Sequence, residues 1–502
     1  MSIAQSLSAN HAMSAPERNL AHLNALRPHK IELTLLIISL FAGLICWTYD
    51  ESLAEIGNIV VPGMLAASVF IGSYLIIRAN SAAILTPLIW NRVTIGVYFC
   101  VGTIIPKYVN DVTKNQINSF YESYDVDIAK FNIVISIFMI SYILLSNFLI
   151  TLINSNSKIA LKFDKSAINS KSFGWLILSV GLSTQIFYVI PSDIGFYDGT
   201  KILFLYEISQ SSFVGCLLIL TNNPANKEKY FIYMYIIFNF TVGILLFNKS
   251  IALFGIVVFF ISNIYNRLDF KKIIISTSIL LYILNFIQPI ILFGRNSIED
   301  ANGFASDASI SERVDVIGYY FTQGQSFDYQ EEAQGGWARL SYLNGATFAI
   351  NAYDSGEPGS SLGPLAFVWI PRFLWKDKPS VTQGGVDFNV AVTGRDTSQS
   401  TPGIPAEGYW NAGWLGVVMA ALLLSLVSTL WSVYSFTVIQ SQSWHLFFIV
   451  MLGIRYGIRT DGMIASDIGG PVVFAVIGHI ALQFLNRLLK ERKPFSRVRF
   501  YN

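Results

Sequence analysis

The chain has 502 residues, of which 53% are hydrophobic and 13% charged, and its mean hydropathy is +0.50. These values exclude a water-soluble globular protein, whose surface needs a larger share of charged residues, and they predict an all-α, polytopic integral membrane protein. The 34 basic and 32 acidic residues nearly cancel, so the orientation must be inferred from where the charges lie along the chain.

The first 30 residues precede the first apolar segment. They contain Arg18, Arg27 and Lys30 but lack the apolar core of a signal peptide. We therefore expect residues 1–30 to form a polar tail on the cytoplasmic side.

Residues 31–293 contain nine apolar segments of spanning length, because a helix of about 20 residues crosses the hydrocarbon core of a bilayer. The predicted spans are 31–48, 57–77, 85–106, 131–153, 173–191, 202–221, 230–247, 250–266 and 273–293. The charged residues Arg92 and Glu207 fall deep inside these spans, where each needs a charged partner or water.

Residues 294–413 form one long connection, which we expect to be a large external loop with a function of its own, since most loops in compact proteins are much shorter. Inside this loop the segment 362–375 is apolar and aromatic, but it is too short to cross and contains Pro364, Pro371 and Arg372. It is predicted to be an interfacial helix or a re-entrant element at the outer membrane surface.

Three further spans are predicted at 414–437, 443–459 and 470–486, followed by a basic tail at 487–502. This makes about twelve transmembrane helices in all. The basic residues of the short loops then fall mainly on one side, as the positive-inside rule requires, so both termini are predicted to be cytoplasmic.

Basic residues in and beside the long loop are candidates for binding a phosphate group, because the arginine fork grips phosphate at two points and stays charged. The alternatives are a solvated loop of mixed charge, an interface anchor around residues 369–379, and snorkelling of basic side chains near helix ends. The candidates within the loop are Arg295, Arg339, Arg372, Arg395, Lys376 and Lys378. Lys249, Arg455 and Arg459 are expected on the same side of the membrane, where they would form the floor of the loop.

Glu407 lies just before a predicted span and is followed by Tyr409 and Trp410. Partial burial there would raise the pKa of this carboxylate toward the range of a general base. The alternative is a carboxylate that caps a helix.

No metal site or cofactor is predicted. Asp125 and Asp127 form an Asp-x-Asp pattern, which holds a metal in some sugar transferases but occurs frequently by chance. None of the five histidines lies in an external loop. No nucleic-acid partner is expected either.

Four short motifs carry a family resemblance: Arg339-Leu340-Ser341, Ile370-Pro371-Arg372, Lys378-Pro379, and 407–413 (EGYWNAG) leading into a span. Together they resemble the Wzy-type O-antigen or oligosaccharide repeat-unit polymerases of the bacterial cytoplasmic (inner) membrane. The resemblance covers mainly residues 295–420, and the rest of the chain matches only in hydropathy. It implies the membrane glycosyltransferase fold that these enzymes share with O-antigen ligases.

The resemblance implies polymerisation of undecaprenyl-pyrophosphate-linked oligosaccharide units into O-antigen, capsular polysaccharide or exopolysaccharide at the periplasmic face, by a metal-independent glycosyltransferase. A chain-length regulator protein is a further partner that such enzymes use. The functional residues usually proposed are periplasmic arginines, which correspond by motif to Arg339 and Arg372 and more loosely to Arg295 and Arg395. Many relatives have an arginine where this chain has Lys249, which keeps the charge but loses the two-point grip.

Three alternatives stay open, and the first is a polysaccharide-linked membrane protein with no catalysis of its own. A flippase or transporter of lipid-linked oligosaccharides would suit twelve spans, but it should place charges at the membrane midplane and keep its loops short. An O-antigen ligase would resemble this chain, but the resemblance to ligases implies a functional periplasmic histidine, which this chain lacks.

Overall fold

The computed structural model describes residues 23–48, 51–119, 121–155, 161, 163–197, 203–266, 269–302, 308–322, 336–370, 374–375, 377–396 and 399–491. Throughout these ranges helices are the only regular secondary structure, which confirms an all-α protein. Nine helices in the same ranges are long and apolar enough to cross a membrane, as expected of a multi-pass membrane protein. The full number of twelve spans stays a prediction.

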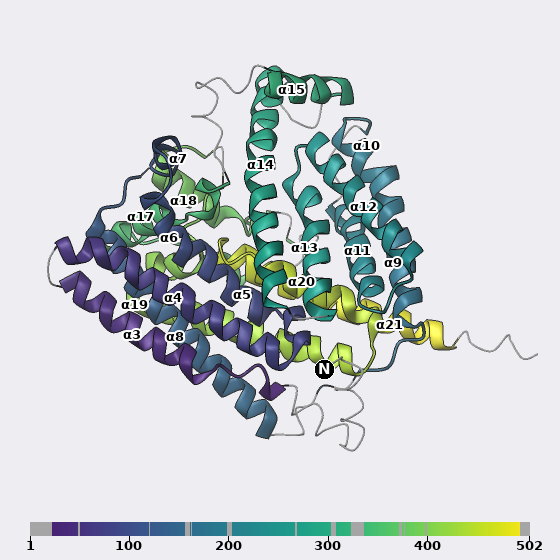
Figure 1. The fold of residues 1–502 in the computed structure, drawn as a ribbon, viewed down its shortest axis with the longest axis horizontal. Helices are drawn as coiled ribbons and strands as arrows, with labels where there is room; N and C mark the ends of the chain where they lie inside the picture. Colours follow the sequence, from purple (N-terminus) through teal and green to yellow (C-terminus); the bar gives the residue numbers. More distant parts are fainter. Residues whose placement is uncertain are drawn as a thin grey trace, which may run out of the picture.

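One group of helices consists of α3 (Lys30–Thr48), α4 (Glu51–Ala79), α8 (Asp125–Ser155) and α19 (Ile404–Gln440), which run alongside one another (Figure 1). The centre of this group is α8, whose apolar side chains are buried on several sides against its neighbours. A helix suits a segment in hydrocarbon because it satisfies backbone hydrogen bonds internally.

The second group stands at an angle to the first in Figure 1. It consists of α9 (Ser170–Thr184), α11 (Leu203–Leu220), α12 (Asn226–Leu245), α13 (Lys249–Asn266) and α14 (Phe270–Asn302). A π-helical turn (η6, Gln185–Val189) and a short helix (α10, Ile190–Asp193) continue α9. The backbones of α9 and α11 approach closely at Gly215, where a Cβ would lie 2.5 Å from the carbonyl oxygen of Gly174. Small residues at such crossings are typical of membrane helices.

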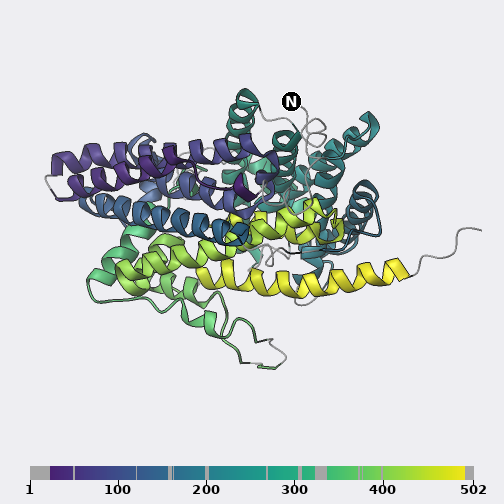
Figure 2. The same cartoon turned by 90° about the horizontal axis from the view of Figure 1, so that it is seen from below.

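Helix α5 (Pro87–Ile95) is continued by η3 (Gly96–Val101), α6 (Gly102–Ile104) and η4 (Ile105–Lys107). It packs against α20 (Phe447–Gly457), which contacts α19 of the first group and α11 of the second and so connects the two groups. A 3-10 turn, η2 (Ser81–Leu85), precedes α5, and another, η9 (Trp444–Leu446), precedes α20. After α20 come the π-helical turn η10 (Ala465–Gly469) and α21 (Gly470–Glu491), which lies at the edge of the molecule (Figure 2).

The predicted external loop is folded into short helices. Helix α14 continues beyond its predicted end to Asn302, and α15 (Ile310–Thr322) lies across that end (Figure 1). At one end of the first group lie α7 (Asp111–Ile117), η7 (Ala338–Leu340), α17 (Leu343–Asp354), η8 (Gly363–Ala366) and α18 (Gln383–Thr393). These elements enclose the polar pocket described below.

The segment 362–375 is described at 362–370 and 374–375, and there it contains only the 3-10 turn η8 rather than the longer interfacial helix that was expected. The proline at position 371 disfavours helical geometry at the residue before it, so a continuous helix across 362–375 is disfavoured. Trp369 is 55% exposed and Leu374 is 70% exposed, as a segment at a membrane interface requires.

Candidate functional site

A break in α19 sets its first turns apart from its membrane-crossing part. Gly413 has φ 57° and ψ −143°, a conformation that is essentially restricted to glycine, and the helix resumes after it. The break brings the backbone of Gly408 against Gly416, where a Cβ would lie 1.9 Å from the Gly408 carbonyl oxygen. The short segment 404–411 is thereby packed beside the pocket.

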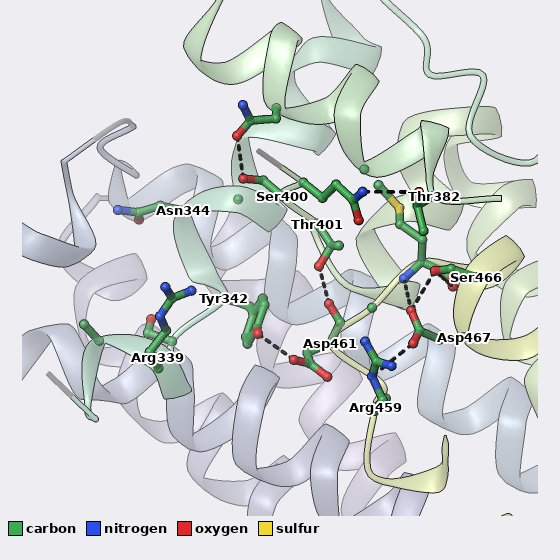
Figure 3. A pocket seen from close by; sticks show the side chains of 18 of the residues that line it. Arg339, Tyr342, Asn344, Thr382, Ser400, Thr401, Arg459, Asp461, Ser466 and Asp467 are labelled. Atoms are coloured by element: carbon green, nitrogen blue, oxygen red, sulfur yellow. Dashed lines mark hydrogen bonds and ion pairs between the residues drawn. The ribbon is translucent and has the colours of Figure 1, made fainter. Parts of the chain in front are cut away.

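A polar pocket of about 680 Å³ opens at the end of the first helix group where α7, α17 and α18 gather. Its walls come from segments far apart in the sequence: the chain after η7, helix α18, the stretch 399–401, and the turn between α20 and η10 (Figure 3). The uncharged polar side chains that line it are Gln116, Ser341, Asn344, Thr382, Asn389, Thr393, Gln399, Ser400, Thr401 and Ser466.

Arg459 is a fixed cation in this pocket. Its Nε lies 3.1 Å from Oδ1 of Asp467, and Asp467 is in turn held at Oδ2 by the N–H of Met463 (3.0 Å) and the hydroxyl of Ser466 (2.8 Å). The Arg459 side chain is 52% exposed, whereas that of Asp467 is 5% exposed. Within the described ranges no partner occupies the two terminal guanidinium nitrogens, so they can bind an anion at two points.

Asp461 is an oriented carboxylate in the same pocket. The hydroxyl of Tyr342 donates to its Oδ2 at 2.6 Å, and the hydroxyl of Thr401 donates to its backbone carbonyl (Figure 3). Burial and the negative charge of Asp461 raise the pKa of Tyr342 well above its ordinary value, so this phenol remains a proton donor. Among the described residues nothing hydrogen-bonds to Oδ1, which leaves one carboxylate oxygen available in the cavity.

Further cations gather beside Arg459. Arg339 lines the pocket with an exposed side chain, and no described residue pairs with it. The charge of Lys249 interacts with those of Arg339, Arg459 and Asp461 and with that of Arg295. The structure therefore brings together four of the predicted residues, two in the wall of the pocket and two near it.

Three predicted residues are engaged elsewhere. The guanidinium carbon of Arg455 lies 5.8 Å from the ring centroid of Tyr456, and this arginine is not part of the pocket wall. The ammonium of Lys378 donates to the carbonyls of Val368 (3.0 Å) and Ile370 (2.8 Å) and so closes the turn after η8. Arg395 is exposed at the end of α18 and does not line the pocket.

Two predicted residues, Arg372 and Lys376, lie outside the described residues. The side chain of Glu207 lies outside them as well.

Glu407 is fully buried, with 0% exposure, and does not line the pocket. Its Oε1 accepts a hydrogen bond from the hydroxyl of Ser361 (2.6 Å), and its Oε2 accepts one from the N–H of Ile464 (2.6 Å). Both oxygens are thus engaged in joining the first turns of α19 to the chain before η10. The role of general base stays a prediction for Glu407, and its surroundings favour a positioning role instead.

Arg92 meets its predicted need for a partner through Glu32, in the first turn of α3. Nη1 of Arg92 lies 3.2 Å from Oε2 of Glu32, and both side chains have 0% exposure. The pair is accommodated by Gly72, where a Cβ would lie 2.4 Å from the Glu32 carboxyl carbon. A charge in hydrocarbon requires such a partner.

Sequence reasoning missed Tyr342, Asp461 and Asp467. The one available signal was that both aspartates follow Arg459 in the short turn before the last predicted span. In the part of the chain that the structure describes, no group of three or more His, Cys, Asp or Glu side chains is arranged to hold a metal ion. Comparison with known proteins gave no match to a family model, to a curated protein or to a solved structure.

Proposed function

We propose that this protein is a membrane glycosyltransferase that polymerises oligosaccharide units linked to a lipid pyrophosphate, with undecaprenyl pyrophosphate as the carrier. The observation that supports this most is the polar pocket, in which Arg459 and Arg339 lie in the same cavity as the available carboxylate oxygen of Asp461. Amide and hydroxyl side chains make up most of the remaining wall, and such groups bind sugar hydroxyls.

In the proposed reaction a hydroxyl of the acceptor sugar attacks the anomeric carbon of the donor sugar. The new glycosidic C–O bond forms as the bond from the anomeric carbon to the pyrophosphate oxygen breaks. The hydroxyl proton passes to Oδ1 of Asp461, which acts as the general base. The negative charge that develops on the lipid pyrophosphate is balanced by Arg459 and Arg339, with Lys249 nearby, so the enzyme needs no metal.

The arrangement of charge favours this proposal over a flippase. The pocket and its cations lie at one end of the helices, whereas a transporter needs its binding groups near the midplane. The buried pair of Arg92 and Glu32 is the observation on which a transport function would rest, but its two charges compensate each other. A histidine-dependent ligase would need a histidine at the site, and the three described histidines, His29, His445 and His479, do not line the pocket.

The proposal is tested by deleting the gene in its host, restoring it with variants, and separating the surface polysaccharide on a gel. We expect the deletion to reduce the ladder to a single repeat unit. Arg459→Ala should restore little, because removing one fixed donor to a developing charge lowers a rate by about 100- to 1,000-fold. The matched control is Arg455→Ala, four residues away, which should restore the full ladder.

An unchanged ladder in the deletion strain would refute the polymerase for that polysaccharide. Loss of even the single-unit band would indicate a flippase or a ligase.

A further inference from the structure

A second cavity, of about 500 Å³, lies on the lipid side of the first helix group and is almost entirely apolar. Its wall is formed by α19, α20 and α21 with the end of α8, and it includes Val427, Trp431, Val472 and Ala475. Three polar atoms in this wall have partners: the indole N–H of Trp431 donates to the carbonyl of Ile449 at 3.0 Å, and the hydroxyl of Tyr434 lies 3.0 Å from Nδ1 of His479. The cavity therefore presents a surface suited to a hydrocarbon chain.

One end of this cavity is polar and cationic. A further cavity of about 490 Å³ adjoins it and shares the lining residues Phe163, His479 and Ile480. The shared end adds Asp164, Gln483, Phe484 and Arg487. Asp164 is paired with Lys490 at 3.4 Å, while Arg487 is exposed and no described acidic side chain pairs with it.

The two cavities together form a groove, named here the α21 groove, whose length suits one membrane lipid. From Val472 to Arg487 the helix α21 rises about 22 Å, at about 1.5 Å per residue. Half of the hydrocarbon core is about 15 Å thick, so the groove reaches from headgroup level past the middle of the bilayer. Few residues of α21 are buried within the protein, so the groove is open to lipid along its length.

We propose that the α21 groove binds one anionic glycerophospholipid from the leaflet opposite the polar pocket. Its phosphate is held by Arg487, with the amide of Gln483 beside it, and one acyl chain fills the apolar cavity between α19 and α21. The occupant is anionic because the only uncompensated charge among the described residues of this end is the arginine. It is a lipid because the groove faces the bilayer and its wall is lined mainly by apolar side chains.

The bound lipid also stabilises helices that pack next to the wall of the polar pocket. Val427 and Trp431 line both the groove and a cavity of about 20 Å³ whose wall also includes Asp467, the residue that holds Arg459. An acyl chain packed against Trp431 therefore stabilises the contact of α19 with α20 and η10. This inference does not depend on the proposed reaction.

The experiment uses the full chain purified from vesicles of phosphatidylcholine alone or with added phosphatidylglycerol, and it measures retained lipid by native mass spectrometry and stability by thermal unfolding. The unsubstituted protein should retain one phosphatidylglycerol and unfold at a higher temperature with it. Arg487→Gln should weaken retention about fivefold, since one basic residue near an anionic membrane contributes about 1 kcal/mol, and Arg487→Lys should restore most of it. Ala475→Trp fills the groove and should abolish retention.

Two matched controls separate the groove from general effects. Ala481→Trp places the same large side chain on the same helix at an exposed position outside both cavities, and retention should not change. Arg78→Gln removes an exposed arginine at the end of α4, outside the groove.

Equal weakening by Arg78→Gln and Arg487→Gln would overturn the site in favour of nonspecific attraction. Retention by Ala475→Trp equal to that of the unsubstituted protein would overturn it as well. Displacement of phosphatidylglycerol by an equimolar polyprenyl phosphate would overturn the assignment to a glycerophospholipid.

Discussion

Three carboxylates lie in or beside the polar pocket, and their hydrogen bonds give them different roles. Glu407 and Asp467 have both oxygens engaged, the first with Ser361 and Ile464 and the second with Arg459, Met463 and Ser466. Asp461 is held through one oxygen only. A carboxylate that accepts a proton needs an oxygen within reach of the substrate, and Asp461 meets this condition.

At the residue scale we predict that Asp461→Asn lowers the polymerisation rate, whereas Glu407→Gln lowers the stability of the protein. Asp461→Asn should lower the polymerisation rate by about 100- to 10,000-fold, the contribution of a positioned general base, and leave thermal unfolding nearly unchanged. Glu407→Gln should lower the free energy of unfolding by about 1–3 kcal/mol, because its amide cannot accept both buried hydrogen bonds. The measurements are polymer synthesis from purified lipid-linked units and thermal unfolding of each variant.

The control at this scale is Asp387→Asn, an aspartate on α18 that accepts from Gln383 and does not line the pocket. If Glu407→Gln keeps normal stability but loses polymerisation activity, Glu407 rather than Asp461 is the general base.

The buried pair of Arg92 and Glu32 shows how a residue can be needed for the fold without taking part in chemistry. Nε and Nη2 of Arg92 and Oε1 of Glu32 make no hydrogen bond with the described protein atoms. Loss of either partner would leave an uncompensated charge in a low-dielectric interior, which is more costly than loss of both. The pair thus specifies how α3 packs beside α5.

At the scale of elements, the shape of α19 decides where the pocket residues lie. Its first turns carry Glu407, which accepts a hydrogen bond from the N–H of Ile464. The pocket residues Arg459 and Asp461 precede Ile464 in the sequence, and Asp467 follows it. A straight helix from Ile404 onward would point these turns away from the turn between α20 and η10. The left-handed backbone at Gly413 prevents this.

We therefore predict that Gly413→Ala lowers the free energy of unfolding by about 1–3 kcal/mol, the cost of a glycine-only conformation, and lowers polymerisation as well. A Cβ at this position would also lie 2.8 Å from the ring of Tyr353. The control is Gly63→Ala in the middle of α4, where nothing lies within 4 Å, and there alanine should be neutral or stabilising by about 0.5–1 kcal/mol. Equal effects of the two substitutions in thermal unfolding would contradict the importance of the break.

For the molecule as a whole, the pocket is formed at the end of the first helix group, where the short helices and the turn before η10 come together (Figures 1 and 3). The distribution of basic residues predicts that this end faces outward and that both termini face the cytoplasm. A polymerase that uses externally displayed lipid-linked units requires that orientation.

The orientation is tested by cysteine labelling in a variant in which Cys46, Cys100 and Cys216 are replaced by alanine. In spheroplasts, Gln399→Cys in the exposed wall of the pocket should react with a membrane-impermeant maleimide. Lys227→Cys, at the exposed start of α12, should react only after permeabilisation. The reverse pattern would place the pocket on the cytoplasmic side and contradict the proposed function.

Much of the architecture follows from local properties of the chain. The predicted spans coincide closely with several helices, for example 131–153 within α8 and 250–266 within α13. Such spans can be predicted because a helix in hydrocarbon satisfies its hydrogen bonds internally, so apolar composition alone identifies it in the sequence. The break in α19 and the short helices of the long connection were not predicted, since they depend on contacts rather than on hydropathy.

The sequence by itself determined the class of the protein, its helical construction and the presence of candidate basic residues in the long connection. Only the tertiary structure decided which cations share a cavity and which carboxylate faces them. Tyr342 meets Asp461 across 119 residues and Glu32 meets Arg92 across 60, and no periodicity links such positions. Side chains with the same charge, such as Lys378 and Arg459, differ in role because their neighbours in space differ, and those neighbours are set by packing.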